Sequence, residues 1–275
     1  MNRSVIRLYA WAGLAAALVF VAAPASAQFK PRPFNDPATG ETYHIEGGAD
    51  LWMPAANITV SSESLNIPGS QIDLKRDLGA TDQTFRALQL QLRPTRSQKF
   101  RLQYIPVTYE SSSTLNQDLI FNGIRYRVGV PVNTTFSWKT YRFGYEYDFV
   151  TKNWGFVGFV VEAKYTDVNV RLASPVASEF AHARGPVPAL GGIARVYVVP
   201  NISITGEFTG FKIPDSIDSR YNAHYVDYDI YGTMNFTNNI GVKGGYRSRD
   251  VGYLINSDSG AFKLRGIYLG AVVRY

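Results

Sequence analysis

The feature that most constrains this chain is a two-residue alternation of apolar and other side chains, which recurs in about ten segments. In 141–149 every odd position is aromatic, and in 157–165 and 226–236 every second position is apolar or glycine. A period of two places successive side chains on opposite faces of a β-strand. No helical periodicity follows residue 28, so the sequence predicts an all-β fold. We expect strands near 42–60, 83–93, 99–110, 134–150, 154–171, 189–199, 201–212, 222–236, 239–254 and 260–275.

The connections between these segments alternate in length. Short ones fall at 94–98, 151–153, 200 and 237–239, and mostly longer ones at 61–82, 111–133, 172–188, 213–221 and 255–259. Tight turns at one end and longer loops at the other are typical of transmembrane β-barrels, in which the turns are periplasmic and the loops extracellular. An open sheet would leave unpaired edges in lipid. We therefore predict a single closed antiparallel barrel over 42–275, with about ten strands and a range of eight to twelve.

The two faces of these strands differ in polarity. Eight residues of a tilted strand cover roughly 20 Å of membrane thickness, which is close to the height of the lipid-facing band of such barrels. We therefore expect the apolar face, with its aromatic residues, to point outward into lipid. A soluble lipocalin-type barrel would have apolar residues inside and charges outside, so it is the less favoured alternative. On the opposite, inward face we place Glu46, Asp50, Gln89, Gln91, Arg101, Gln103, Arg142, Glu146, Asp148, Glu162, Lys164, Arg195, Glu207, Asp227, Asp229, Lys243, Arg247, Arg249 and Arg274.

The N-terminal residues indicate the compartment. Arg3 and Arg7 precede a short apolar run that ends in Ala25-Ser26-Ala27, the pattern of a secretory signal peptide with its cleavage site. We expect residues 1–27 to be removed and the proline-containing stretch 28–41 to be an extended periplasmic leader. The chain has no cysteine, so its stability after export depends on backbone pairing and packing.

The C-terminal strand ends on an alternating row: Ile267, Leu269, Ala271, Val273 and Tyr275. This row resembles the C-terminal signal that outer-membrane proteins present to the β-barrel assembly machinery. With the signal peptide, the chain resembles the small Gram-negative outer-membrane β-barrel proteins, a likeness that is specific for the class and not for one family. The resemblance implies location in the bacterial outer membrane and two partners, the membrane lipid and the assembly machinery. We expect a monomer.

Charges on the inward face suggest what fills the barrel. A ten-stranded barrel is narrow, and a nearly balanced set of acids and bases favours ion pairs inside it. We expect Arg142 and Lys164 to pair with carboxylates of their own hairpin, within a network of Arg142, Glu146, Asp148, Glu162, Lys164 and Arg247.

The leading functional interpretation is a non-enzymatic barrel that displays loops at the cell surface. The alternative is a narrow, porin-like channel for small polar solutes.

Enzymatic chemistry at the barrel rim is a second alternative. The stretch "HYVDYD" (224–229) resembles the rim of the ten-stranded omptin proteases, but His224 lies three residues from Asp227, which puts the two on opposite faces of a strand. Lipid A deacylases use a His and a Ser, and no such pair stands out here. His44, His182 and His224 lack metal-site spacing. We expect no catalytic residue, metal, cofactor or nucleic-acid partner.

Overall fold

The computed structural model describes residues 36–61, 69–175, 178–212, 221–255 and 258–275, and in these residues the regular structure is entirely β. None of the described residues forms a helix with the length and hydrophobicity needed to cross a membrane. The predicted signal peptide (1–27) and most of the predicted leader (28–41) lie outside the described residues.

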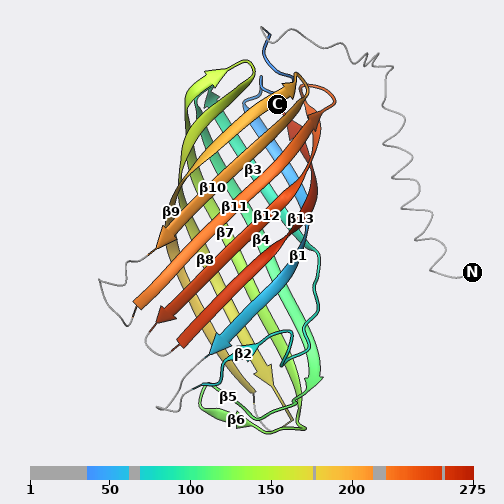
Figure 1. Ribbon diagram of the computed structural model, residues 1–275, viewed down its shortest axis with the longest axis vertical. Coiled ribbons are helices and arrows are strands. Elements are labelled where there is room, and N and C mark those ends of the chain that lie inside the picture. Colours follow the sequence, from blue (N-terminus) through green and yellow to red (C-terminus); the bar gives the residue numbers. More distant parts are fainter. Residues whose placement is uncertain (1–35, 62–68, 176–177, 213–220, 256–257) are drawn as a thin grey trace, which may run out of the picture. The chain divides into compact units, whose positions relative to one another are not determined.

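Ten long strands form one closed antiparallel barrel (Figure 1). Each strand pairs with its neighbours in the chain, and β13 closes the barrel against β1 in a register that runs from Glu46 opposite Arg274 to Ser61 opposite Ser259. The predicted closed barrel of about ten strands is confirmed. The strands are β1 (Ile45–Ser61), β3 (Phe85–Thr95), β4 (Gln98–Thr114), β7 (Pro131–Lys152), β8 (Gly155–Ala173), β9 (Ser178–Val199), β10 (Ile202–Lys212), β11 (Tyr221–Asn235), β12 (Ile240–Ile255) and β13 (Asp258–Arg274).

The two ends of the barrel carry different connections. At one end, here called the turn end, the strands are joined by the short turns 96–97, 153–154, 200–201 and 236–239. The opposite end, here called the loop end, holds the β1–β3 and β4–β7 connections (Figure 1). These two connections contain the short strands β2 (Ile72–Asp73), β5 (Leu119–Phe121) and β6 (Ile124–Tyr126).

Two of the predicted loops are wrong, because strands occupy most of them. The range 172–188 is largely β8 and β9, which leaves only 174–177, and 255–259 is reduced to 256–257. Pro186 and Pro188 made the first range look like a loop. Proline is tolerated at a strand edge, where its missing N–H removes no ladder bond. In the described residues β10 pairs with β9 only from Leu190 onward, so the two prolines lie on an edge.

The outer surface of the turn-end half is apolar. Phe143, Val161 and Leu269 on three different strands are exposed there, and the predicted outward rows of β7 and β8 point out of the barrel. Exposed aromatic residues lie at both limits of this apolar band. Towards the turn end they are Phe149, Trp154, Phe236 and Tyr275, and on the other side Tyr141, Tyr165, Tyr228 and Tyr246. Such paired aromatic girdles are typical of barrels in lipid.

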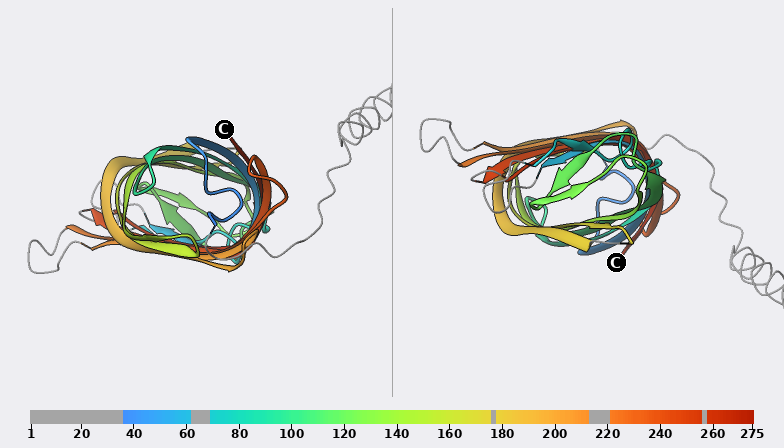
Figure 2. Two further views of the ribbon diagram at one scale, coloured as in Figure 1. Left: turned by 90° about the horizontal axis from the view of Figure 1, so that it is seen from above. Right: turned by 90° about the horizontal axis from the view of Figure 1, so that it is seen from below.

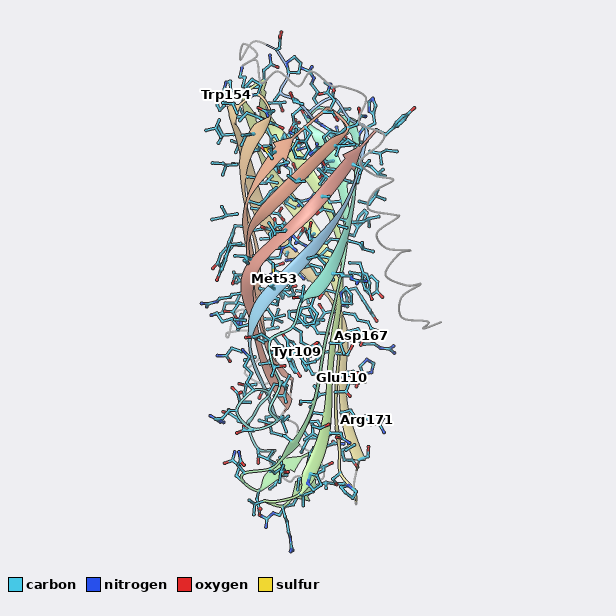
Figure 3. All side chains as sticks on the ribbon, turned by 90° about the vertical axis from the view of Figure 1, so that its right-hand side faces the viewer. Met53, Tyr109, Glu110, Trp154, Asp167 and Arg171 are labelled. Atoms are coloured by element: carbon cyan, nitrogen blue, oxygen red, sulfur yellow. The ribbon has the colours of Figure 1, made fainter. Side chains whose placement is uncertain are left out.

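The polarity of both faces inverts part-way along the long strands. On β7 the outward side chains change from aromatic to polar beyond Tyr141, and the inward ones change from charged to apolar at Trp138 and Phe136. On β8 the outward row continues beyond Tyr165 to Asp167 and Arg171. Figure 3 shows Trp154 at the turn end, Met53 near the middle, and Asp167 and Arg171 beyond it. The strands therefore continue well past the apolar band.

In the loop-end half the barrel wall becomes two facing sheets. β3 pairs with β1 only as far as Trp52, and with β4 only as far as Tyr104, although both neighbours run on. β9 likewise extends beyond β10 on the other side. The sheets β4–β7–β8–β9 and β11–β12–β13–β1 enclose an apolar core between them.

Candidate functional site: the interior of the barrel

Charged side chains form a buried layer across the turn-end half of the barrel interior. All six residues proposed from the sequence as a lumen network lie in it, and none is more than 8% exposed: Arg142, Glu146, Asp148, Glu162, Lys164 and Arg247. Charges in such a place must be paired, because removing them from water is costly.

Arg142 and Lys164 connect the two sides of this layer. Arg142 Nη2 lies 2.6 Å from Glu162 Oε1 and 2.9 Å from Glu207 Oε1. Lys164 Nζ lies 2.9 Å from Asp227 Oδ2 and 3.3 Å from Glu162 Oε2. Glu207 and Asp227 come from β10 and β11, so these ion pairs run across the interior and not only within the β7–β8 hairpin.

Glu146 and Asp148 contact Lys99, which the sequence analysis did not place on the inward face. Lys99 Nζ lies 2.5 Å from Glu146 Oε1 and 2.8 Å from Asp148 Oδ2, and its side chain is almost fully buried. Arg101 adds contacts of 3.3 Å to Glu146 and 2.5 Å to Glu207. Lys99 lies two residues before Arg101, on the same inward face of the strand, so the alternation indicated its direction. It was missed because it lies at the predicted start of its strand.

Arg247 belongs to a second group beside the first. Its Nη2 lies 2.8 Å from Asp229 Oδ2 and 3.4 Å from Asp50 Oδ2. Lys243 also contacts Asp50, at 2.9 Å, and the Tyr268 hydroxyl donates a hydrogen bond of 2.9 Å to Asp229. The group joins β1, β11, β12 and β13, and so ties together the strands on both sides of the closure.

A carboxylate from outside the barrel strands completes the charged layer at the turn end. Glu41 lies 2.8 Å from Arg93 Nη1 and 2.9 Å from Arg195 Nη1, and accepts a hydrogen bond of 2.7 Å from the Tyr197 hydroxyl. Burial alone would raise the pKa of Glu41. The nearby positive charges of Arg195, Arg93 and Lys99 outweigh burial and lower the pKa from 4.5 to about 2.

The segment that carries Glu41 lies in the turn-end opening of the barrel (Figure 2). The Thr39 N–H donates a hydrogen bond of 2.8 Å to the Pro200 carbonyl, and Asn235 Nδ2 donates one of 2.6 Å to the Thr39 carbonyl. Tyr43 is buried, with the guanidinium of Arg93 5.1 Å from its ring centroid. Residues 36–41 belong to the stretch expected to be a leader, and here most of them contact the barrel interior.

The loop-end half of the interior is apolar, which the sequence analysis did not anticipate. Phe262 packs against Phe136 and Trp138 with ring centroids 5.4 and 5.8 Å apart. The assignment of a uniformly polar lumen is therefore wrong for this half. The loop segments contribute to the same core through Ile72, Leu74, Leu78, Leu119, Phe121 and Tyr126.

Cations lie over aromatic rings where the two layers meet. Lys164 Nζ is 4.1 Å from the centroid of Tyr225, and the guanidinium of Arg247 is 4.3 Å from that of Tyr268. An aromatic face attracts a cation and also packs against apolar groups. The border between the charged and the apolar layer thus has favourable contacts on both sides.

A small cavity remains among the charges. It measures about 50 Å³ and its lining includes Glu46, Arg101, Arg142 and Arg195. A volume of this size has room for a few water molecules and for no larger solute.

Two of the three histidines, His182 and His224, have single acidic neighbours. His224 Nε2 lies 3.4 Å from Asp250 on the outer face, and His182 Nε2 lies 3.0 Å from Asp167. Asp227, by contrast, is buried inside. The described residues contain no group of three or more His, Cys, Asp or Glu side chains placed to hold a metal ion.

The C-terminal row lies on the outer face of β13. Ile267, Leu269 and Val273 are each more than half exposed, and Tyr275 is 87% exposed at the turn end. Ala271 continues the same row. The residues proposed as an assembly signal therefore form one continuous outward strip.

Comparison with known proteins gives the class of the fold. No protein-family model and no curated protein sequence matches the chain. Among solved structures, it is similar to the outer membrane protease OmpT from Escherichia coli, with a TM-score of 0.57, 7% identity, and coverage of 88% of this chain and 100% of that one.

Two further structures are more distant. They are Ail, the attachment invasion locus protein of Yersinia pestis (TM-score 0.38, 8% identity, 85% of this chain and 100% of that one), and the toluene transporter TodX of Pseudomonas putida (0.34, 8%, 93% and 93%). The chain has the fold of the outer-membrane β-barrel proteins. At 7% identity the likeness to OmpT extends to the fold alone.

Proposed function

We propose that this chain is a non-enzymatic protein of the bacterial outer membrane, whose filled barrel supports a rigid platform at the cell surface. The observation that carries the proposal is the filling of the interior in three successive layers. These are the segment with Glu41 and Tyr43, the charged layer around Arg142, and the apolar core around Trp138. Among the described residues, the cavities between these layers measure about 50 Å³ each. The connections at the loop end are then the part of the protein that is exposed at the cell surface.

Membrane placement follows from the outer surface. Lipid covers the apolar band between the aromatic girdles, and the polar strand extensions of the loop end project on the extracellular side. The signal peptide is removed on export, and the chain then inserts with its turn end in the periplasm.

Planar-bilayer conductance tests the filled barrel. The full-length mature protein, inserted into a lipid bilayer, is expected to show no steady current. A large, stable, ohmic current from the wild type would contradict the proposal. Insertion is checked in parallel by heat-dependent mobility in detergent electrophoresis, which separates a silent barrel from a protein that never inserted.

A narrow channel is the second candidate, and the polar cavity near Arg142 favours it. In that case the segment with Glu41 is a removable plug. Glu41→Lys would repel Arg93 and Arg195 and release the segment. Current in Glu41→Lys but not in Glu41→Gln would support a gated channel. Silence in both variants would support the filled barrel.

The outward row of β13 is proposed as the signal for the β-barrel assembly machinery. Tyr275→Asp is expected to lower the amount of protein in outer-membrane fractions several-fold. Phe236→Asp is the matched control, because Phe236 is also an exposed aromatic at the turn end but belongs to the β11–β12 turn and not to the C-terminal row. Equal yields of the two variants would show that Tyr275 acts only as a girdle residue.

A further inference from the structure

The charged layer inside the barrel holds one more cation than it holds carboxylates. The inward residues predicted from the sequence comprise eight carboxylates and eight cations, and all of them form ion pairs in the interior. To these the described residues add two cations, Arg93 and Lys99, and one carboxylate, Glu41. A net charge in a buried place is costly unless a counter-charge lies close to it. The layer therefore carries one positive charge that the described part of the chain leaves without a carboxylate.

The surplus of positive charge is concentrated around the cavity of about 50 Å³. Two carboxylates line this cavity, Glu46 and Glu162, against five cations: Arg101, Arg142, Arg195, Lys243 and Arg274. Other partners of these cations, such as Glu41 for Arg195 and Asp50 for Lys243, are not among the described residues that line it. The cavity is therefore a place of positive potential within the charged layer.

Arg142 also has hydrogen-bonding capacity left over at this cavity. Its Nε is buried and makes no hydrogen bond to any described residue. Its Nη1 donates a hydrogen bond of 3.0 Å to Gln103 Oε1, which accepts another of 3.1 Å from Arg249 Nη2. A neutral amide oxygen thus lies between two guanidinium groups, although a charged acceptor makes the stronger hydrogen bond with such groups. Gln103 lines the cavity as well, so it marks a position where negative charge is missing.

We propose that the cavity binds one small monovalent anion, chloride, as the counter-ion of the charged layer. Charge sets the sign and the valence, because a single negative charge balances the layer. Size sets the class of anion, because a space that holds a few water molecules takes a halide ion with a water molecule beside it. Arg101, Arg142 and Lys243 are the cations that face the anion. The inference goes beyond the proposed function, since it needs only the folded interior and applies to a filled or a conducting barrel.

The dependence of unfolding on chloride tests the site. The full-length mature protein is folded into phosphatidylcholine vesicles and unfolded with urea at several chloride concentrations. Gluconate, which is too large for the cavity, replaces chloride so that the ionic strength stays constant. For one anion that is bound by the folded state and released on unfolding, a tenfold rise in chloride lowers the unfolding equilibrium constant by up to about tenfold.

Two variants change the charge of the site itself. Gln103→Glu supplies the missing negative charge with little change of shape, so its unfolding should no longer depend on chloride. Lys243→Gln removes one lining cation while Asp50 keeps Arg247, and it should also abolish the chloride dependence, even if the variant is less stable overall. Gln83→Glu is the matched control. It makes the same substitution at an exposed position in the β1–β3 connection and should keep the dependence of the wild type.

The outcomes decide between a bound anion and a cavity that holds only water. An unfolding equilibrium constant of the wild type that does not change with chloride would overturn the site. The same chloride dependence in the wild type, Gln103→Glu and Lys243→Gln would also overturn it, because chloride would then act on the outer surface. In crystals grown with bromide, anomalous scattering should locate a bromide ion beside Arg142, and its absence from the cavity would count equally against the proposal.

Discussion

The same strands form both halves of this barrel, but the polarity of the inner and outer faces is reversed between the two halves. In the turn-end half the outside is apolar and the inside charged, as Phe143 and Arg142 show. In the loop-end half the outside is polar and the inside apolar, as Lys139 and Trp138 show. These four residues lie within one stretch of β7. The proposed membrane placement explains the difference, because it puts apolar surface against lipid in one half and away from water in the other.

In the proposed membrane placement, the same strand faces lipid in one half of the barrel and water in the other. The inversion near Thr140 and Tyr141 on β7 marks this change of medium. The charged layer is held by specific pairs, whereas the apolar layer is held by packing. The two layers should therefore respond differently to substitution, salt and pH.

The largest expected effect is in the apolar half. Trp138→Ala removes a fully buried side chain and leaves a cavity, so it should lower the free energy of unfolding by about 3–5 kcal/mol. Urea unfolding of the vesicle-folded protein, followed by circular dichroism, measures this. Lys139→Ala, the exposed neighbour, should cost less than about 0.5 kcal/mol. Similar costs for the two would mean that this half is not packed as described.

A slightly smaller effect is expected in the charged half. Arg142→Gln removes the nearest cation of Glu162 and one of the two cations of Glu207, and should cost about 3 kcal/mol, because the amide keeps some hydrogen bonding. The same unfolding measurement applies. Replacing Arg142 together with Glu162 by Met and Gln should recover part of the loss. A double variant as unstable as the sum of both single changes would show that the two residues are not coupled.

The outer face gives a third contrast within one strand. Phe159→Arg places a charge against lipid within the apolar band and should cost about 2 kcal/mol. Asn169→Arg lies on the same outward face of β8 but beyond the band, and should be close to neutral. Equal costs in vesicles would contradict the position of the boundary between the two halves.

The smallest expected effect is a pH dependence at the turn-end opening. The pKa of Glu41 is about 2 in the folded protein and 4.5 ordinarily, so the ionised carboxylate stabilises the segment fully above about pH 4.5. That contribution is lost progressively as the pH falls from 4.5 towards 2. The protection factors of residues 38–43, that is their exchange rates relative to the intrinsic rate at each pH, should therefore fall in the wild type across this range.

The control for this titration is Glu41→Gln, whose protection factors should be nearly independent of pH in the same range. Asp36→Asn changes an exposed carboxylate just before the segment and should behave like the wild type. Unchanged protection factors in the wild type from pH 6 to pH 2 would argue that Glu41 does not hold the segment.

Alternation in the sequence predicted the strand number, the outward rows and the inward charges of the turn-end half, because side-chain direction in a strand is a local property. The same alternation also indicated the apolar core of the loop-end half. Phe136 and Trp138 share the inward parity of Arg142, and the inversion of polarity could be read from those positions. It was missed because one polarity rule was applied along whole strands.

The sequence by itself determined that this chain forms a closed barrel of alternating strands, since period, turn spacing and the C-terminal row are all local patterns. Only the tertiary structure decided the partners. Glu41 meets Arg195, 154 positions away, and Arg142 meets Glu207 across the interior. Those pairs depend on the register of every strand around the barrel, on where β3 and β10 end, and on how the segment before β1 turns inward. No local pattern encodes these distances, because each is the sum of many strand pairings.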